Sequence, residues 1–202
     1  QLAVHEPRGN PRVHAAARGL GAGLLARRRL EPEGISWNGE HAVVRNLLGM
    51  AHGAGGIGLA LLELLRATGD ERFFAGAAAA LRYEDVFYDP ATGDWPDLRH
   101  PALAAYLDAG RVRELREAVA SDTLDLSITP RPAAGWRYGT PGIALVRARF
   151  FELTRLERYR VALDHAAARC REHVSTPADE PTLDGPVLAA ADALLERARL
   201  TG

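Results

Sequence analysis

The chain has 202 residues, of which 47% are hydrophobic and 25% charged, and its formal net charge is −1. These values are typical of one soluble globular domain, and the near-neutral charge argues against a nucleic-acid partner. All 25 basic residues are arginine. The absence of lysine excludes Schiff-base chemistry by a lysine and the lysine-containing phosphate loop.

The cysteine count and the hydropathy pattern indicate the cellular compartment in which we expect the protein. Cys170 is the single cysteine, which excludes an internal disulfide and a multi-cysteine zinc site within one copy of the chain. No apolar run approaches the roughly 20 residues that a membrane span requires, and the N-terminus lacks a signal peptide. We therefore expect a cytoplasmic protein with no membrane contact. The start at Gln1 rather than Met is consistent with a piece of a longer chain.

The residue pattern predicts a nearly all-helical chain. Alanine, leucine and arginine dominate long stretches, β-branched residues are sparse, and Gly or Pro separates the blocks. We expect a loop at 31–50, an irregular stretch at 86–100 and a flexible segment near 122–135. The predicted helices cover residues 13–30, 54–68, 70–85, 101–121, 141–154, 156–174 and 186–200.

An internal repeat organises these helices. Residues 51–73 align without gaps on residues 137–159, and a weaker third copy begins at residue 183. Repeated helix pairs bury their apolar surface by stacking on one another. The matching pairs are Gly53/Gly139, Gly56/Gly142, Ile57/Ile143, Leu59/Leu145, Thr68/Thr154, Glu71/Glu157 and Arg72/Arg158.

The two helices of one repeat differ in kind. Residues 57–65 are apolar nearly all round, whereas residues 70–85 are amphipathic. An inner ring of helices wrapped by an outer ring, an α/α toroid, is the simplest architecture, and we expect residues 1–202 to form a single domain of this type. Glycines at 53, 56 and 58 let the inner helix start abruptly, so that the N-termini of the inner helices converge on one central patch.

Three ordered motifs then carry a family resemblance. Residues 49–73 ("GMAHGAGGIGLALLELLRATGDERF"), 88–99 ("YDPATGDWPDLR") and 135–145 ("GWRYGTPGIAL") together resemble the lanthionine synthetase C-like (LanC-like) family. The closest likeness is to the C-terminal cyclase domain of the class II lanthipeptide synthetases, LanM. The resemblance implies a double ring of helices, of which this chain supplies about half. It implies a fragment, a shortened relative, or a subunit that associates with a partner.

The family closes thioether rings in dehydrated peptides. The resemblance implies that zinc lowers the pKa of a peptide thiol, that the thiolate adds to a dehydroamino acid, and that a histidine handles the proton. That histidine corresponds to His52 here. In the alternative interpretation, His52 is a hydrogen-bonded structural residue inherited from an active ancestor. The family's zinc ligands are the cysteine of a Trp-Cys-His/Tyr-Gly motif and the cysteine and histidine of a later Cys-His-Gly motif.

This sequence departs from the family pattern at each zinc ligand. The positions hold Arg137, Leu183 and Asp184 in place of cysteine, cysteine and histidine. A guanidinium repels a metal dication, so we expect no zinc cofactor, and Arg137 could pair with Asp184 instead. Tyr138 fits the pattern. We expect Trp37, Trp136 and Tyr138 to line a cleft for an extended peptide, although packing between helices is an equally good interpretation of both tryptophans.

For two other groups of residues, a structural role is the better interpretation than a functional one. Cys170 and His173 have the spacing of a metal pair, but they fall on an outer helix, where a solvated face is expected. The carboxylates of Asp89, Asp94 and Asp97 around Trp95 could be those of a glycosidase. In the family pattern, the turn and an Asp97/Arg99 pair brace the loop instead.

Three functions remain open. The first is a LanC-like domain with a degenerate zinc site, which binds a dehydrated precursor peptide or supports a partner modification enzyme. The second is an active, metal-independent lanthionine cyclase, and the third is a carbohydrate-active toroid. The substrate peptide, the ring pattern and the oligomeric state, including a homo-oligomer, are not determined by the sequence.

Overall fold

The computed structural model describes residues 10–39, 45–99, 135–175 and 186–201, with a few further residues between 111 and 123. Helices dominate this part of the chain, which confirms the all-α prediction. One short antiparallel hairpin was not predicted. The elements are α1 (Pro11–Ala26), β1 (Arg29–Glu31), β2 (Gly34–Ser36), α2 (Ala54–Thr68), α3 (Glu71–Asp85), α6 (Thr140–Thr154), α7 (Glu157–Ser175) and α8 (Pro186–Thr201).

Local capping explains most of the helix boundaries. Asp70 caps α3 by accepting a hydrogen bond from the Arg72 backbone N–H at 3.1 Å, and Gly69 ends α2 with a φ of 71°. The first helix ends at Ala26 rather than at residue 30, because Arg29 already belongs to β1. The predicted helix at 101–121 and the flexible segment at 122–135 lie largely outside the described residues.

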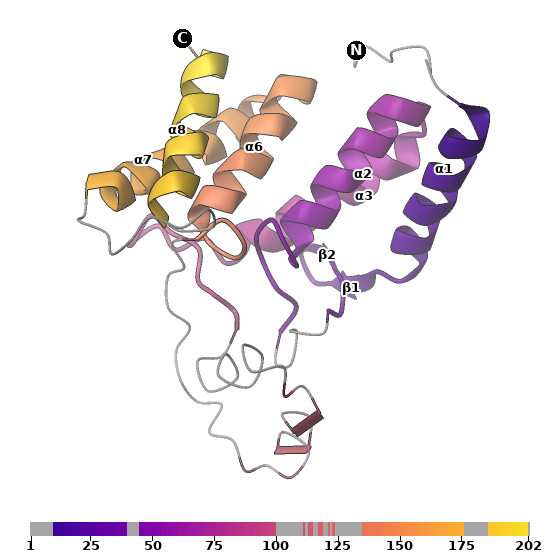
Figure 1. Ribbon diagram of the computed structural model, residues 1–202, viewed down its shortest axis with the longest axis horizontal. Coiled ribbons are helices and arrows are strands. Elements are labelled where there is room, and N and C mark those ends of the chain that lie inside the picture. The colour runs from indigo at the N-terminus through magenta and orange to yellow at the C-terminus, as the bar shows by residue number, and fades with distance from the viewer. Residues whose placement is uncertain are drawn as a thin grey trace.

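The helices form an arc of inner and outer members (Figure 1). The inner helices α2 and α6 lie side by side in the middle of the view, and α8 continues the row next to α6. Behind them, α3 packs on α2 and α7 packs on α6, while α1 covers the far edge of the first pair. The inner helices start at the same end of the molecule, where the loops gather. The predicted inner and outer rows are therefore present.

The two complete helix pairs repeat each other in detail. The N-caps Gly53 and Gly139 have the same backbone conformation, with φ of −103° and −104° and ψ of 177° in both. Thr68 and Thr154 each donate a side-chain hydrogen bond to a carbonyl one turn earlier, at 2.6 Å. The sequence repeat is therefore a structural repeat.

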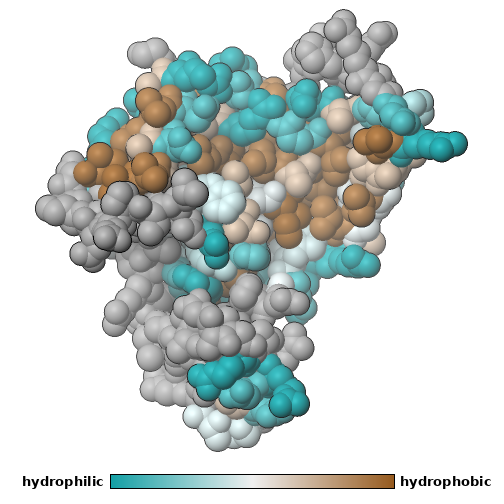
Figure 2. Space-filling view, in the orientation of Figure 1, coloured by the Kyte–Doolittle hydropathy of each residue, from teal (hydrophilic) through white to brown (hydrophobic). Residues whose placement is uncertain are grey.

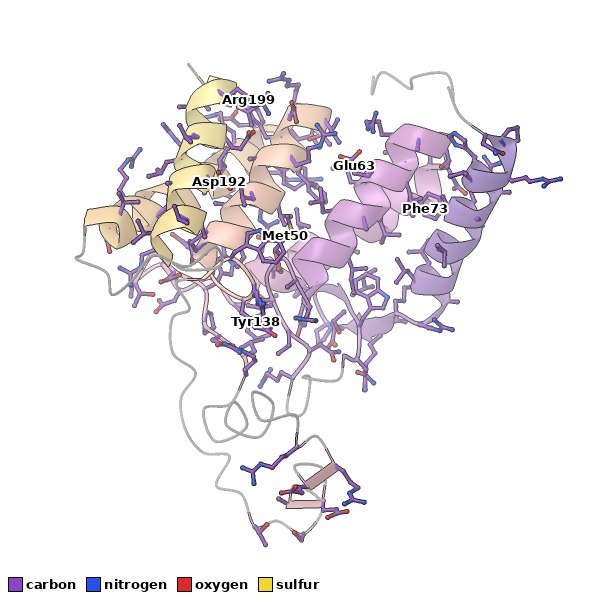
Figure 3. The ribbon with its side chains drawn as sticks, viewed as in Figure 1. Met50, Glu63, Phe73, Tyr138, Asp192 and Arg199 are labelled. Atoms are coloured by element: carbon purple, nitrogen blue, oxygen red, sulfur yellow. The ribbon has the colours of Figure 1, made fainter. Side chains whose placement is uncertain are left out.

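Equivalent positions of the two pairs also contact each other directly. Glu63 on α2 and Arg149 on α6 are 86 residues apart, and they form an ion pair of 2.5 Å. Figure 3 shows Glu63 in the space between these two helices. Such contacts between like positions are expected where two copies of one unit stand side by side with the same orientation.

The core lies between the inner and outer rows. Leu61, Ala80, Ile143 and Phe150 are fully buried there, and Leu163 on α7 joins them. Apolar side chains also reach the surface across the middle of the face in Figure 2, with hydrophilic residues along its upper border. No helix among the described residues has the length and apolar character needed to cross a bilayer.

The end of α6 provides a test of the repeat. Arg155 occupies the left-handed position that glycine occupies in the first unit, with a φ of 55°. We expect Arg155→Gly to raise the free energy of unfolding by about 0.5–1 kcal/mol, because a side chain at positive φ is strained. Guanidinium denaturation measures this change. The control Arg82→Gly, in the exposed face of α3, should lower the stability by about 1 kcal/mol.

Candidate functional site

The His52 loop runs from Asn46 to Gly53 and leads into α2. It folds back on the helix start, because the Ala54 N–H donates to the Leu47 carbonyl at 2.9 Å and the Gly56 N–H donates to the Gly49 carbonyl at 3.1 Å. Gly49 has a φ of 90°, which favours glycine. These bonds satisfy N–H groups at the start of α2 that would otherwise lack a helical partner.

Close backbone approach requires the glycines at this helix start. A Cβ on Gly56 would lie 1.9 Å from the Met50 carbonyl oxygen, and a Cβ on Gly53 would lie 2.2 Å from that of Leu48. The second unit has the same crowding, because a Cβ on Gly142 would lie 1.9 Å from the Trp136 carbonyl oxygen. The predicted steric role of glycines 53 and 56 is confirmed, whereas a Cβ on Gly58 would meet Leu81 and Ala80 of α3 rather than the loop at the helix entrance.

A buried carboxylate ties the His52 loop to the start of α2. Glu84, on α3, has no exposed surface, and its Oε1 accepts hydrogen bonds from the Gly49 N–H at 2.7 Å and the Gly55 N–H at 3.0 Å. Burial raises the pKa of Glu84, and the charge of Arg147 and the two N–H groups oppose that rise. Sequence reasoning missed Glu84, although its spacing from Phe73, Ala77 and Leu81 places it on the buried face of α3.

The loops before α2 and α6 bring His52 and Tyr138 together. Their rings stack with centroids 5.6 Å apart and planes 21° apart. The Ala51 N–H donates to the Arg137 carbonyl at 3.0 Å, so the loop backbones are joined next to the stack. His52 is exposed and Tyr138 is half-buried. Figure 3 shows Tyr138 among the loops beyond the starts of the inner helices. The predicted convergence of the inner helix entrances is therefore present for these two residues.

A cation lies against the tyrosine. The Arg99 guanidinium carbon is 3.8 Å from the centroid of the Tyr138 ring. Asp97 fixes the guanidinium by accepting hydrogen bonds from its Nε–H and Nη2–H groups, and the ion pair between the two residues is 2.7 Å long. The predicted Asp97/Arg99 pair is thus confirmed, and it holds the guanidinium against the Tyr138 ring.

The two tryptophans occupy different environments. Trp37 is buried, and its Nε1–H donates to the Leu24 carbonyl at 2.7 Å, which favours the packing interpretation. Trp136 is half-buried in the loop that carries Tyr138. Of the residues expected to line a peptide cleft, Trp136 and Tyr138 lie in the loop that contacts His52, and Trp37 lies in the core beside α1.

Comparison with known families identifies the chain. Residues 25–175 match the family model described as "Lanthionine synthetase C-like protein". The chain belongs to this family. No curated protein and no solved structure matches the chain. The matched range of this LanC-like chain includes the His52 loop, the Asp97/Arg99 pair and the Tyr138 loop. The closer likeness to the LanM cyclase domain stays a prediction.

The structure describes Arg137, one of the three positions that the resemblance assigns to zinc ligands in this LanC-like chain. Arg137 is exposed in the Tyr138 loop, and a guanidinium cannot donate to a metal ion. Leu183 and Asp184 lie outside the described residues, so the expected pairing of Arg137 with Asp184 is untested. Within the described ranges, no group of three His, Cys, Asp or Glu side chains could hold a metal ion.

The position of Cys170 corrects one expectation. The cysteine lies on outer helix α7, as predicted, but it is fully buried rather than on a solvated face, because it packs in the apolar core between the rows. Burial raises the pKa of its thiol to about 12, and the Asp94 charge adds to this rise. A neutral, inaccessible thiol is a poor nucleophile.

Cys170 should therefore resist thiol reagents. We expect native protein to show no reaction with Ellman's reagent at neutral pH, and one thiol per chain after denaturation in guanidinium. Rapid reaction of the native protein would contradict the buried position. The result also sets the background for any assay that counts peptide thiols.

Asp94, one of the carboxylates around Trp95, has structural partners. Asp94 is buried, accepts a hydrogen bond from the Thr140 hydroxyl and forms an ion pair of 2.7 Å with Arg169. Trp95 is 2% exposed, so its ring is covered rather than available to a sugar. These contacts hold the start of α6 and favour the bracing interpretation over a glycosidase pair.

Proposed function

We propose that this LanC-like chain binds dehydrated precursor peptides and supports thioether ring formation in a lanthipeptide-type modification system, without zinc at the family's ligand positions. Family membership supports the peptide-modification role. The His52–Tyr138 stack at the adjoining entrances of α2 and α6 is the observation that carries the proposal. A histidine held open to solvent beside a tyrosine and an arginine is suited to a peptide that arrives from outside.

The same geometry favours a metal-independent cyclase as the second candidate. In thioether formation, the peptide cysteine loses its proton, and its sulfur bonds to the β-carbon of the dehydroamino acid. The resulting enolate then takes a proton at the α-carbon, so the reaction is an addition with no net oxidation. His52 can move these protons, since its ring is exposed.

A thiol count separates the two candidates. We expect a peptide with one dehydroalanine and one cysteine to bind more tightly than the matched peptide with serine in place of dehydroalanine, as measured by calorimetry. If the chain is a cyclase, peptide thiols are lost with time, and His52→Ala slows this loss about 100-fold or more, as expected for removal of a general acid or base.

The outcomes differ clearly. Tight binding without thiol loss supports the binding role, and His52-dependent loss supports the cyclase. Equal binding of both peptides, with no thiol loss, would contradict the proposal. The variant His165→Ala is the matched control, because His165 is exposed on α7 and stacks on Tyr88 rather than Tyr138.

A further inference from the structure

Two fully buried charged residues lie between the repeat units. Glu84 on α3 and Arg147 on α6 have no exposed side-chain surface, and their closest oxygen and nitrogen atoms, Oε2 and Nη2, are 3.2 Å apart. A buried ion pair is weak evidence for stability, because desolvation offsets the attraction. We therefore look to the contacts of this pair, rather than to its contribution to stability, for its role.

The contacts of Glu84 point to the His52 loop. Its Oε1 bonds to the Gly49 N–H before His52 and to the Gly55 N–H after it, so one oxygen atom closes the loop. Gly55 allows this approach, since a Cβ there would lie 2.5 Å from the same oxygen. The backbone on both sides of His52 is thus fixed to α3.

Arg147 connects this carboxylate to the other half of the site. Its Nη2 lies 3.2 Å from Glu84 Oε2 and 3.0 Å from Asp85 Oδ1, and α6 begins directly after the Tyr138 loop. Among the described residues, its Nε and Nη1 have no hydrogen bond partner. The guanidinium is therefore held by the carboxylates at the end of α3, which links α6 to the residue that fixes the His52 loop.

The second repeat unit shows that the fold does not require this carboxylate. Cys170 occupies the position in α7 that Glu84 occupies in α3, and it is fully buried. The start of α6 is held differently, through Asp94 and the Thr140 hydroxyl. A helix pair of the same geometry thus forms without a carboxylate that bonds to the loop backbone.

We infer that Glu84 is a positioning residue for His52: its carboxylate fixes the loop backbone on both sides of the histidine, and Arg147 aligns that carboxylate with α6, so that His52 meets Tyr138. The inference rests on the proposed function only for the chemical use of His52. The placement itself can be measured without any peptide.

The test compares His52 reactivity with stability in three variants. Glu84→Gln keeps an oxygen acceptor for the loop but leaves Arg147 a weaker partner. Glu84→Met removes the acceptor, and the double variant Glu84→Met/Arg147→Leu also removes the buried cation. Diethyl pyrocarbonate modification, followed for each histidine by peptide mass spectrometry, measures placement, and thermal unfolding measures stability.

We expect the His52 modification rate and the Tm to change independently of each other in these variants. The His52 modification rate should rise about three- to tenfold in Glu84→Met and in the double variant, because a loop that has lost one or two hydrogen bonds no longer holds one face of the imidazole against Tyr138. It should stay within about twofold of the wild-type rate in Glu84→Gln, despite a lower Tm, because the acceptor is kept. The double variant should regain part of the Tm lost in Glu84→Met, while its His52 rate stays high.

His165 supplies the internal control, and its rate should be the same in all variants. If the double variant returns the His52 rate to the wild-type value together with the Tm, or if the His52 rate rises in Glu84→Gln, Glu84 is only structural and the inference is wrong. A raised His52 rate in a chain that binds no dehydrated peptide would instead retain the inference and contradict the proposed function.

Discussion

Gly56→Ala is expected to lower the free energy of unfolding by about 3–5 kcal/mol, which is a severe effect for one methyl group. The added Cβ would lie 1.9 Å from the Met50 carbonyl oxygen and 2.8 Å from the Met50 carbonyl carbon. Both are backbone atoms, so no side chain can rotate away. Relief requires that the His52 loop leave the start of α2, which would also separate His52 from Tyr138. Guanidinium denaturation followed by circular dichroism measures the loss of stability.

The chain supplies matched controls for this substitution. Gly142→Ala should be equally severe, because its Cβ would lie 1.9 Å from the Trp136 carbonyl oxygen. Gly19 and Gly23 lie within α1, where an added Cβ would meet no side chain or neighbouring element of the described residues within 4 Å, so alanine there should stabilise the protein by about 0.5–1 kcal/mol. A similar small change in the free energy of unfolding at all four positions would contradict the role of crowding at the helix start. It would show that helix propensity alone decides the effect of alanine at these positions.

The sequence predicts the helix pairs and the meeting of the two loops because both follow from local and periodic signals. Helix α2 has the predicted bounds, since Gly53 and Gly69 mark its ends. His52 and Tyr138 occupy the same position in two aligned repeats, so copies that stand side by side bring them together. The repeat alone therefore predicts that Tyr138 lies next to His52.

The sequence does not predict features that depend on distant partners. The strands β1 and β2 have three residues each, too few for a visible alternation of polar and apolar positions. The role of Glu84 depends on Arg147, which is 63 residues away along the chain. Cys170 is followed by the polar residues Arg171, Glu172 and His173, which suggest a solvated face. The packing of α7 on its neighbours buries the cysteine instead.

Arg147→Leu is expected to destabilise the protein by about 3–5 kcal/mol, because it leaves the buried Glu84 carboxylate without its cation. The effect should depend on pH. Burial raises the pKa of Glu84 above its ordinary value of 4.5, so the folded state holds the proton more tightly than the unfolded state. The stability associated with this group is then fully present below about pH 4.5 and is lost as the pH rises through the raised pKa.

Removal of Arg147 raises that pKa further, since the cation opposes the rise in the native protein. The difference in unfolding free energy between wild type and variant should therefore be smallest at acidic pH and grow toward neutral pH, as measured by urea titrations across this range. Arg66→Leu is the control, because Arg66 forms an exposed ion pair with Glu63, and its loss should lower the stability by less than about 1 kcal/mol. A constant difference at every pH would show that Arg147 contributes packing rather than charge, and that the Glu84 carboxylate does not depend on it.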